Sequence, residues 1–352
     1  MKRILYLANV EVPYRARFFQ MLSQQVDLTV LFESKKTTYR DETWMNSLQL
    51  SYKKEYLGGF HTRDDNRFSL SIITWIRKGW DLVIVGGYNS PVQAFAILLM
   101  RIMRIPFAIS TDGESFIGND LKSSVKKFFL HGAKLYLAAG EKSSEELKRA
   151  IHPKVPVYVY NFSSLTREDL LSNKAAYSPN RKDYILVVAG YFEYKRIDVV
   201  LDVARMDKTI RYKFVGMGNR TNLFLDENKD LPSNVEVIPF MQTKELYQAY
   251  AECKALVLPS RQECWGLVVS EAASFGTPIV STYGSGAARE FIMDQYPQYL
   301  AMPGDVKGLY QCICQCLSDE KIEEYSEFLL RKSENYCLET CVNVHVSAIN
   351  SL

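Results

Sequence analysis

What this sequence lacks disfavours several common enzyme classes. Residues 1–40 contain no glycine, so the first predicted strand is not followed by the G-x-G-x-x-G turn of a nicotinamide-dependent oxidoreductase. The chain has four histidines, and they form no cluster with the spacing of a metal site. We therefore expect neither a bound metal nor another cofactor.

Patterned cysteines and long apolar runs are also missing. The seven cysteines form no framework of a small disulfide-rich domain. The alternating Cys312, Cys314 and Cys316 would point about 200° apart on a helix, so they cannot all face one ion. The most apolar stretch, 91–100, is too short to span a bilayer. Residues 1–10 predict a strand rather than a secretion signal, and we expect a cytoplasmic protein.

Charge is divided unevenly between the two halves. Residues 1–175 carry 25 Lys and Arg against 17 Asp and Glu, whereas residues 176–352 carry 18 against 23. The basic half favours an anionic partner, such as the inner face of a membrane, although solvated surface charge explains the same numbers. The segment that would contact a membrane is basic and aromatic, and it holds Arg101, Arg104, Lys122, Lys126, Lys127, Phe128 and Phe129.

Short β-branched runs alternate with helical patterns along the whole chain, which predicts parallel sheets covered by helices. A polar stretch at 166–183 is interpreted as a linker, and from 306 onwards only helices are expected. Strands are predicted at 3–8, 28–32, 82–85, 107–111 and 135–139, then at 184–189, 212–215, 235–238, 255–258 and 278–281. The fold class is therefore α/β, with two doubly wound units in tandem.

The densest group of chemically informative residues follows strand 255–258. A loop with Ser260 and Glu263 leads into a helix that is expected to start near Trp265 and to end at Gly276. The first N–H groups of such a helix suit a diphosphate. Glu263 and Glu271 flank this anion site, and carboxylates accept hydrogen bonds from sugar hydroxyls. Alternatively, Glu263 only complements the helix dipole and Glu271 is a solvated helix residue.

Residues 256–291 resemble the E-x7-E signature of the retaining glycosyltransferases of family 4, also called group 1. The matching positions are Pro259, Ser260, Glu263, Trp265, Gly266, Leu267, Val268, Glu271, Ala272, Gly276, Pro278, Ser281, Gly284 and Gly286. The resemblance implies that Glu271 binds the donor ribose. It also implies that Glu263 and the backbone of Gly266, Leu267 and Val268 hold the donor sugar, with Ser260 in the same donor loop.

The segment 190–198 resembles a second family motif, in which an Arg and a Lys neutralise the leaving diphosphate. Lys195 matches the Lys, but Tyr191 stands at the usual Arg position. Arg196 is the candidate for the second positive charge, which would contribute strongly to catalysis. Alternatively, Lys195 and Arg196 only begin a helix on a solvent face, and the missing Arg leaves open a non-catalytic sugar-nucleotide-binding protein.

Two further segments are expected near the donor. Gly216 and Gly218 follow strand 212–215, and glycines let the backbone approach a phosphate or a nucleoside, although a tight turn alone explains them. Phe240 and Met241 follow strand 235–238 and are candidates for contact with the base. Core or rim positions are the alternative for both.

The first half matches the family more loosely, through a "P.YR..FF" opening, a "GGYNSP" loop and a "DG" loop typical of bacterial surface-polysaccharide members. Arg15 is a candidate for an acceptor phosphate or the donor diphosphate, and Tyr88 and Asn89 are candidates for acceptor contact. Asp112 is a candidate catalytic carboxylate, or simply the Asp of an Asp-Gly turn.

Together the motifs imply the GT-B fold, with two Rossmann-like domains facing across a cleft. The acceptor domain would be 1–170, the donor domain 178–325, and residues 326–352 would return to the first domain. The implied activity is metal-independent, retaining transfer of a hexose-type sugar from a nucleotide diphosphate sugar to a glycan or lipid-linked glycan, in surface polysaccharide biosynthesis. A GT-B epimerase remains an alternative, and no nucleic-acid partner is expected.

Overall fold

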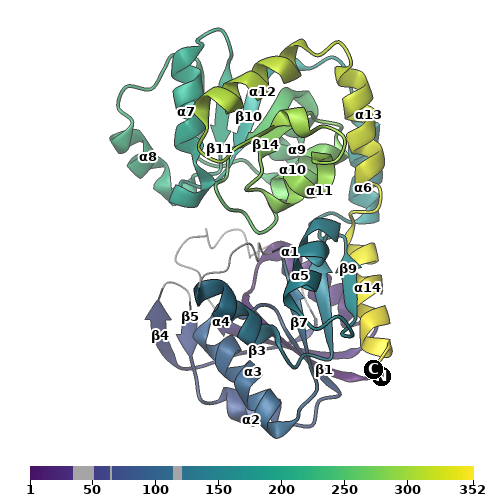
Figure 1. Cartoon of the computed structure of the whole chain (residues 1–352). Helices are drawn as coiled ribbons and strands as arrows, with labels where there is room; N and C mark the ends of the chain where they lie inside the picture. The colour runs from purple at the N-terminus through teal and green to yellow at the C-terminus, as the bar shows by residue number, and fades with distance from the viewer. Residues whose placement is uncertain (35–50, 64–65, 114–120) are drawn as a thin grey trace. The chain divides into compact units, whose positions relative to one another are not determined.

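A computed structural model describes residues 1–34, 51–63, 66–113 and 121–352 (Figure 1). The chain forms two compact units. The first comprises Met1–Phe162 with Leu338–Leu352, and the second comprises Ser163–Cys337. These boundaries differ from the predicted ones at 170, 178 and 326. Glu114 of the predicted "DG" loop lies outside the described residues.

The first unit is built on a seven-stranded sheet in the order β3-β2-β1-β6-β7-β8-β9, in which each strand is parallel to its neighbours. The strand order reverses between β1 and β6, and ligands of such sheets bind at the carboxyl ends around that point. The strands are β1 (Arg3–Val10), β2 (Asp27–Ser34), β3 (Lys53–Tyr56), β6 (Leu82–Val85), β7 (Phe107–Thr111), β8 (Leu135–Ala139) and β9 (Val157–Tyr160).

Helices cover this sheet, and the hairpin β4 (Phe60–Arg63) and β5 (Asn66–Phe68) adjoins it (Figure 1). The helices are α1 (Pro13–Leu22), α2 (Ile72–Ile76), α3 (Pro91–Met103), α4 (Leu121–Leu130), α5 (Glu141–Ala150) and α14 (Leu338–Asn350). The last helix packs against α1 and β9. Its buried His345 lies against the rings of Phe18 and Tyr160, with centroids 4.7 and 4.8 Å away. Aromatic burial thus joins the chain's last helix to the first unit.

The second unit has a six-stranded parallel sheet in the order β12-β11-β10-β13-β14-β15. Its strands are β10 (Lys182–Val188), β11 (Tyr212–Val215), β12 (Val235–Ile238), β13 (Cys253–Leu258), β14 (Ile279–Thr282) and β15 (Leu300–Ala301). Its α-helices are α6 (Arg167–Ala175), α7 (Ile197–Met206), α8 (Thr221–Glu227), α9 (Thr243–Glu252), α10 (Leu267–Ser274), α11 (Gly286–Ile292), α12 (Val306–Ser318) and α13 (Ile322–Ser333).

The predicted linker at 166–183 is the clearest difference from expectation, because half of it is helix α6. The side chain of Thr166 accepts a hydrogen bond from the Asp169 N–H, and the Asp169 carboxylate accepts one from the Thr166 N–H. This capping box satisfies two backbone donors that a helix start leaves unpaired. Leu170 is buried beside Cys337 and Leu165. A polar composition therefore concealed a short, well-capped helix with one buried side.

The predicted class, two parallel α/β units of Rossmann-like architecture, is confirmed. The chain interior of β1 is completely buried from Ile4 to Ala8, apart from a slight exposure of Tyr6, as expected for parallel strands covered on both faces. Within the described residues, no helix combines the length and apolar character needed to cross a membrane.

Candidate functional site

The loop after β13 in the second unit is held from the neighbouring strand. The Ser281 hydroxyl donates to the carbonyl oxygen of Leu258 at 2.7 Å, and the Thr282 hydroxyl donates to that of Ser260 at 2.5 Å. Ser260 is itself fully buried. The carboxyl ends of β13 and β14 are therefore fixed to each other before the loop begins.

Backbone contacts then fix Glu263. Its N–H donates to the Gly284 carbonyl oxygen at 2.8 Å, and its own carbonyl accepts from the Gly286 N–H at 3.1 Å. A Cβ at Gly284 would collide with the carbonyl oxygen of Ser260, and one at Gly286 with that of Cys264. The two glycines predicted from the family motif are thus required because the donor loop lies directly on them.

The carboxylate of Glu263 forms an ion pair with Lys195, and Ser260 donates to it at 3.3 Å. The side chains of Lys195 and Glu263 are each 17% exposed. Lys195 ends the 3-10 turn η2 (Glu193–Lys195), and the Arg261 N–H donates to the Tyr194 carbonyl oxygen at 2.8 Å. The structure therefore brings the two predicted donor motifs together. In this structure Ser260 contacts Glu263 through its hydroxyl.

Helix α10 presents its amino end beside this pair. Gly266 is its N-cap with a φ of 97°, a left-handed conformation that favours glycine. The helix thus begins at Leu267, close to the expected start near Trp265. Leu267 and Val268 are half-buried, and the first N–H groups of a helix have no intrahelical acceptor. Gly276, with a φ of 61°, follows the helix end as predicted.

Glu271 lies in the second turn of α10 and is half-buried. One carboxylate oxygen accepts from the Ser164 hydroxyl at 2.6 Å, and the other accepts from the Tyr250 hydroxyl at 3.1 Å. Burial raises the pKa of the Glu271 carboxyl, and these two hydrogen bonds lower it. Each oxygen keeps a lone pair for a further donor.

The glycines after β11 lie at the same carboxyl edge of the second sheet. Gly216 and Gly218 both have positive φ, at 95° and 54°. The Gly218 N–H donates to the Pro239 carbonyl oxygen at 2.9 Å, which ties this turn to the loop carrying Phe240 and Met241. Phe240 is exposed and Met241 half-buried. The predicted base-side residues are therefore neighbours, at the carboxyl ends of β11 and β12.

The guanidinium of Arg196 is paired with a neighbouring carboxylate. Its Nε and Nη2 atoms donate to the Asp198 carboxylate at 2.9–3.0 Å, and this hydrogen bonding raises the pKa of Arg196. Arg220, which the sequence did not predict as a site residue, lies at this motif instead. Its guanidinium donates to the Tyr191 carbonyl oxygen at 3.1 Å and lies 4.3 Å from the centroid of the Phe192 ring. An Arg two residues after the G-x-G turn was the available signal.

In the first unit, Arg15 and Asp112 are paired with each other. They form an ion pair, and the Tyr160 hydroxyl donates to Asp112 at 3.2 Å. Arg15 extends from α1 and Asp112 follows β7, so both lie at the carboxyl edge of the sheet. Tyr88, predicted as an acceptor contact, is instead a buried member of the hydrophobic core, whereas Asn89 is exposed.

A buried carboxyl at the same edge was not predicted. Glu33, near the end of β2, accepts from the Ser90 hydroxyl at 2.8 Å, and its second oxygen has no hydrogen-bond partner among the described residues. Burial raises the pKa of Glu33 to about 7, against hydrogen bonds from Ser90 and Gln93. The Gln93 amide nitrogen donates to Asn9. The run of apolar residues before Glu33 indicated burial, but nothing local indicated its partners.

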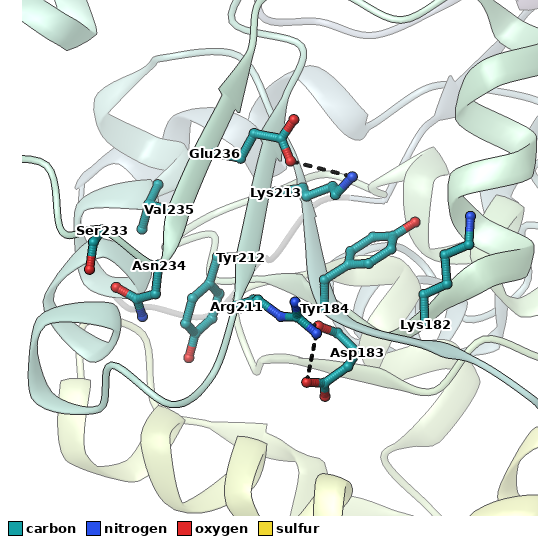
Figure 2. Close-up of a pocket in the computed structure, with 10 residues that line it drawn as sticks. All are labelled: Lys182, Asp183, Tyr184, Arg211, Tyr212, Lys213, Ser233, Asn234, Val235 and Glu236. Carbon is teal, nitrogen blue, oxygen red and sulfur yellow. Dashed lines mark hydrogen bonds and ion pairs between the residues drawn. The ribbon is translucent and has the colours of Figure 1, made fainter.

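A hollow of about 610 Å³ lies elsewhere in the second unit (Figure 2). It is lined at the amino ends of β10, β11 and β12, by residues such as Lys182, Arg211 and Glu236. Ion pairs between exposed side chains, Arg211 with Asp183 and Lys213 with Glu236, border it. Because ligands of parallel α/β sheets bind at the carboxyl ends, the Glu263 edge, and not this hollow, is the candidate functional site.

The two parallel α/β units and the site around α10 define the GT-B class. Residues 172–328, all within the second unit, match the family described as glycosyl transferases group 1. An uncharacterized glycosyltransferase of Methanocaldococcus jannaschii is 23% identical over 75% of this chain and 74% of its own length. The N-acetyl-alpha-D-glucosaminyl L-malate synthase of Bacillus anthracis is 28% identical over 47% and 45%.

Solved structures share the whole fold. The crystal structure of Anabaena Alr3699/HepE in complex with UDP superposes with a TM-score of 0.74 at 15% identity, and the match covers 99% of this chain and 100% of that one. The likeness therefore extends over both units, including the first unit, which the family match does not reach.

Proposed function

We propose that this chain is a retaining glycosyltransferase of family 4. It would transfer a hexose-type sugar from a nucleoside diphosphate sugar to a glycan or lipid-linked glycan in surface polysaccharide biosynthesis. The observation that carries the proposal is the Lys195–Glu263 ion pair beside the amino end of α10. Glu271 lies in the second turn of the same helix.

Without a ligand, the charges of Lys195 and Glu263 balance each other, and a diphosphate could replace Glu263 as the partner of Lys195. Glu263 neutralises Lys195 in the free protein. A bound diphosphate would share Lys195 and occupy the N–H groups of Leu267 and Val268. Glu263 would then be released toward the hydroxyls of the donor sugar. The backbone contacts to Gly284 and Gly286 would hold Glu263 in place during this exchange.

The same groups support the chemistry. As the bond between the sugar and the diphosphate breaks, charge develops on the leaving oxygen, and Lys195 and the helix amides stabilise it. In the proposed retaining route, the acceptor hydroxyl attacks on the side from which the diphosphate departs. Its proton passes to the diphosphate. The positive groups are supplied by side chain and backbone, so the proposed route uses neither a metal nor another cofactor.

For the nucleotide we propose uridine diphosphate. The support is the likeness of the fold to the HepE structure, which was crystallised with UDP. The exposed Phe240 and half-buried Met241 beside Gly218 would contact the base. The acceptor would bind to the first unit, where Asn89 is exposed at the carboxyl edge of the sheet.

A membrane surface would bring a lipid-linked acceptor to the first unit. Apolar side chains on α3 and α4 are exposed beside cations: Ile102 is 79% and Phe128 49% exposed. The Arg101 guanidinium lies 4.8 Å from the centroid of the Phe128 ring, and Arg104 is exposed. Exposed aromatic and apolar groups beside cations suit an anionic bilayer. We propose a peripheral position at the inner face of the membrane.

A ligand-stabilisation experiment tests the donor. Thermal unfolding would be followed with UDP, GDP, ADP, TDP and NAD, for the native chain and for Glu271→Ala. A nucleotide at about 100 times its Kd adds roughly 2.7 kcal/mol to the native state. We expect UDP to stabilise the native chain and to lose this effect with Glu271→Ala. Stabilisation by NAD alone, or by none of the five, would overturn the proposal.

A product assay then separates transfer from the alternatives. Incubation with UDP-sugars, followed by analysis of the released nucleotide and sugar, should show UDP release. An epimerised sugar nucleotide would instead identify an epimerase. Binding of UDP with no release in the presence of any acceptor would indicate a non-catalytic sugar-nucleotide-binding protein.

A further inference from the structure

The ribose carboxylate of the proposed function is held by two residues that belong to neither donor motif. Ser164 follows Phe162, the last residue of the first unit in this part of the chain, by two positions. Its hydroxyl donates to one oxygen of Glu271 at 2.6 Å. Tyr250, from the last turn of α9, donates to the other oxygen at 3.1 Å. Both contacts lie within the second unit.

The Ser164 hydroxyl is not needed to shape its own turn. The neighbouring hydroxyl of Ser163 accepts from the Leu165 N–H at 3.0 Å, and Thr166 and Asp169 cap the helix that follows. These bonds define the segment without Ser164. The interaction of the Ser164 side chain with Glu271 therefore acts on the carboxylate and not on the local backbone.

Tyr250 is the second anchor and is rigid. Its ring is fully buried against Tyr247 and Phe275, with centroids 6.5 and 6.1 Å away. Because the ring is fixed by its neighbours, the Tyr250 hydroxyl has one position. That hydroxyl in turn fixes the position of the Glu271 oxygen to which it donates. The other oxygen is aimed by Ser164, and the plane of the carboxylate is then determined.

The two donors leave a defined binding capacity. A carboxylate has about four lone-pair sites, and Ser164 and Tyr250 occupy one on each oxygen. One site per oxygen remains, which matches two neighbouring hydroxyls that donate side by side. A ribose presents such a pair at its 2′ and 3′ positions, whereas a 2′-deoxyribose presents one.

We propose that Ser164 and Tyr250 are positioning residues that aim Glu271 at the 2′,3′-diol of the donor ribose and so set the preference for ribonucleotide over deoxyribonucleotide donors. This inference rests on the proposed function. It adds that the segment joining the two units, through Ser164, takes part in donor recognition.

The charge of Glu271 depends on the same bonds. Burial raises the pKa of this carboxyl, and the hydrogen bonds from Ser164 and Tyr250 lower it. Removing either donor should therefore raise the pKa of Glu271 further. As the pH is lowered, the variant should then lose nucleotide binding at a higher pH than the native chain does. Tyr250 is the titratable group that faces Glu271, and burial raises its own pKa well above the usual value, so it stays protonated throughout.

The test uses the full chain and two probes, UDP and 2′-deoxy-UDP, whose Kd values are measured by calorimetry. Ser164→Ala and Tyr250→Phe remove the donors, and Ser164→Thr keeps a hydroxyl. Ser163→Ala is the matched control, because it removes a hydroxyl one residue away that bonds to backbone and not to Glu271. Circular dichroism without ligand checks that each variant folds.

We expect the native chain to prefer UDP over 2′-deoxy-UDP. Ser164→Ala and Tyr250→Phe should each weaken UDP binding by about tenfold, as for loss of a hydrogen bond to a charged group, and weaken 2′-deoxy-UDP binding less. The preference should therefore shrink. Ser164→Thr should restore it, and Ser163→Ala should keep it at the native value.

Distinct outcomes overturn the inference and the function beneath it. If UDP does not bind the native chain, both fail. If UDP binds and Glu271→Gln abolishes the ribose preference, but Ser164→Ala and Tyr250→Phe leave it unchanged, only the positioning role fails. It also fails if Ser163→Ala reduces the preference as much as Ser164→Ala, because the effect is then a disturbance of the turn.

Discussion

The buried carboxyl of Glu33 should make the protein less stable as the pH rises. Glu33 is 1% exposed, and burial raises its pKa from 4.5 to about 7. The native state therefore keeps a proton that the unfolded chain releases. Its stabilising contribution is complete below the unfolded pKa of 4.5 and is lost as the pH rises through about 7.

The size of this effect follows from the two pKa values. One pKa unit corresponds to about 1.4 kcal/mol, so the shift of Glu33 corresponds to about 3 kcal/mol between acid and alkaline pH. His345 opposes it, because burial lowers its pKa from 6.5 to about 4. The contribution of His345 is complete above pH 6.5 and is lost as the pH falls through about 4. The two slopes largely cancel between pH 4.5 and 6.5.

Glu33→Gln removes the pH dependence of stability that comes from Glu33 and leaves the one that comes from His345. The amide carries no charge. Among the described residues the buried Gln93 Oε1 atom beside it has no donor, and the new amide N–H can supply one. At pH 8 the variant should be more stable than the native chain by up to about 3 kcal/mol. At pH 4.5 the two should be nearly equal.

Urea unfolding of the full chain at pH 4.5, 6.5 and 8 measures this difference. Glu11→Gln is the control, because hydrogen bonds from Tyr52, Lys54 and Tyr56 hold the pKa of Glu11 below its usual value. That variant should be less stable than the native chain at pH 8. The reasoning is refuted if Glu33→Gln is no more stable than the native chain at pH 8, or if its advantage is the same at pH 4.5.

Three further predictions concern the two sheet edges. Lys195→Gln should lower kcat by about a hundredfold or more, because it removes a charge that stabilises the leaving group. Steady-state kinetics with a UDP-sugar measures this effect, and an unchanged kcat contradicts the role. Asp112→Asn should lower stability in urea unfolding by about 1–3 kcal/mol, because it leaves the half-buried Arg15 without its charged partner. The double variant with Arg15→Met should recover part of that loss. Gly286→Ala should weaken UDP binding, because its Cβ would displace the Cys264 carbonyl; calorimetry checks this.

The buried parts of the fold were readable from the chain alone. All ten predicted strands are present, because strands covered on both faces need continuous apolar runs. The edge strands β3, β9 and β15 were missed. β3 has the polar sequence KKEY and its first three residues are exposed. β3 lies at an edge of its sheet and pairs on one side only, so its residues need not be apolar and its composition gives no strand signal.

Local spacing also determined the donor loop. The interval from Glu263 to Glu271 and the glycines at 266, 276, 284 and 286 are consequences of one loop and one helix that follow each other directly. Backbone contacts of this loop and helix require particular residues at fixed positions, so the sequence alone shows the pattern. The start of α10 at Leu267, directly after the left-handed Gly266, also lies close to the predicted position.

The partners of each charged group were decided by tertiary structure. Lys195 and Glu263 are 68 residues apart, Arg15 and Asp112 are 97 apart, and Ser164 and Glu271 are 107 apart. Parallel strands bring loops that are remote along the chain to one edge of a sheet, and the strand order sets which loops meet. Composition and spacing determined that this protein has two such sheets and a donor loop. Only the packing of the strands decided that Lys195 would pair with Glu263, that Tyr88 would enter the core, and that Ser164 would reach Glu271.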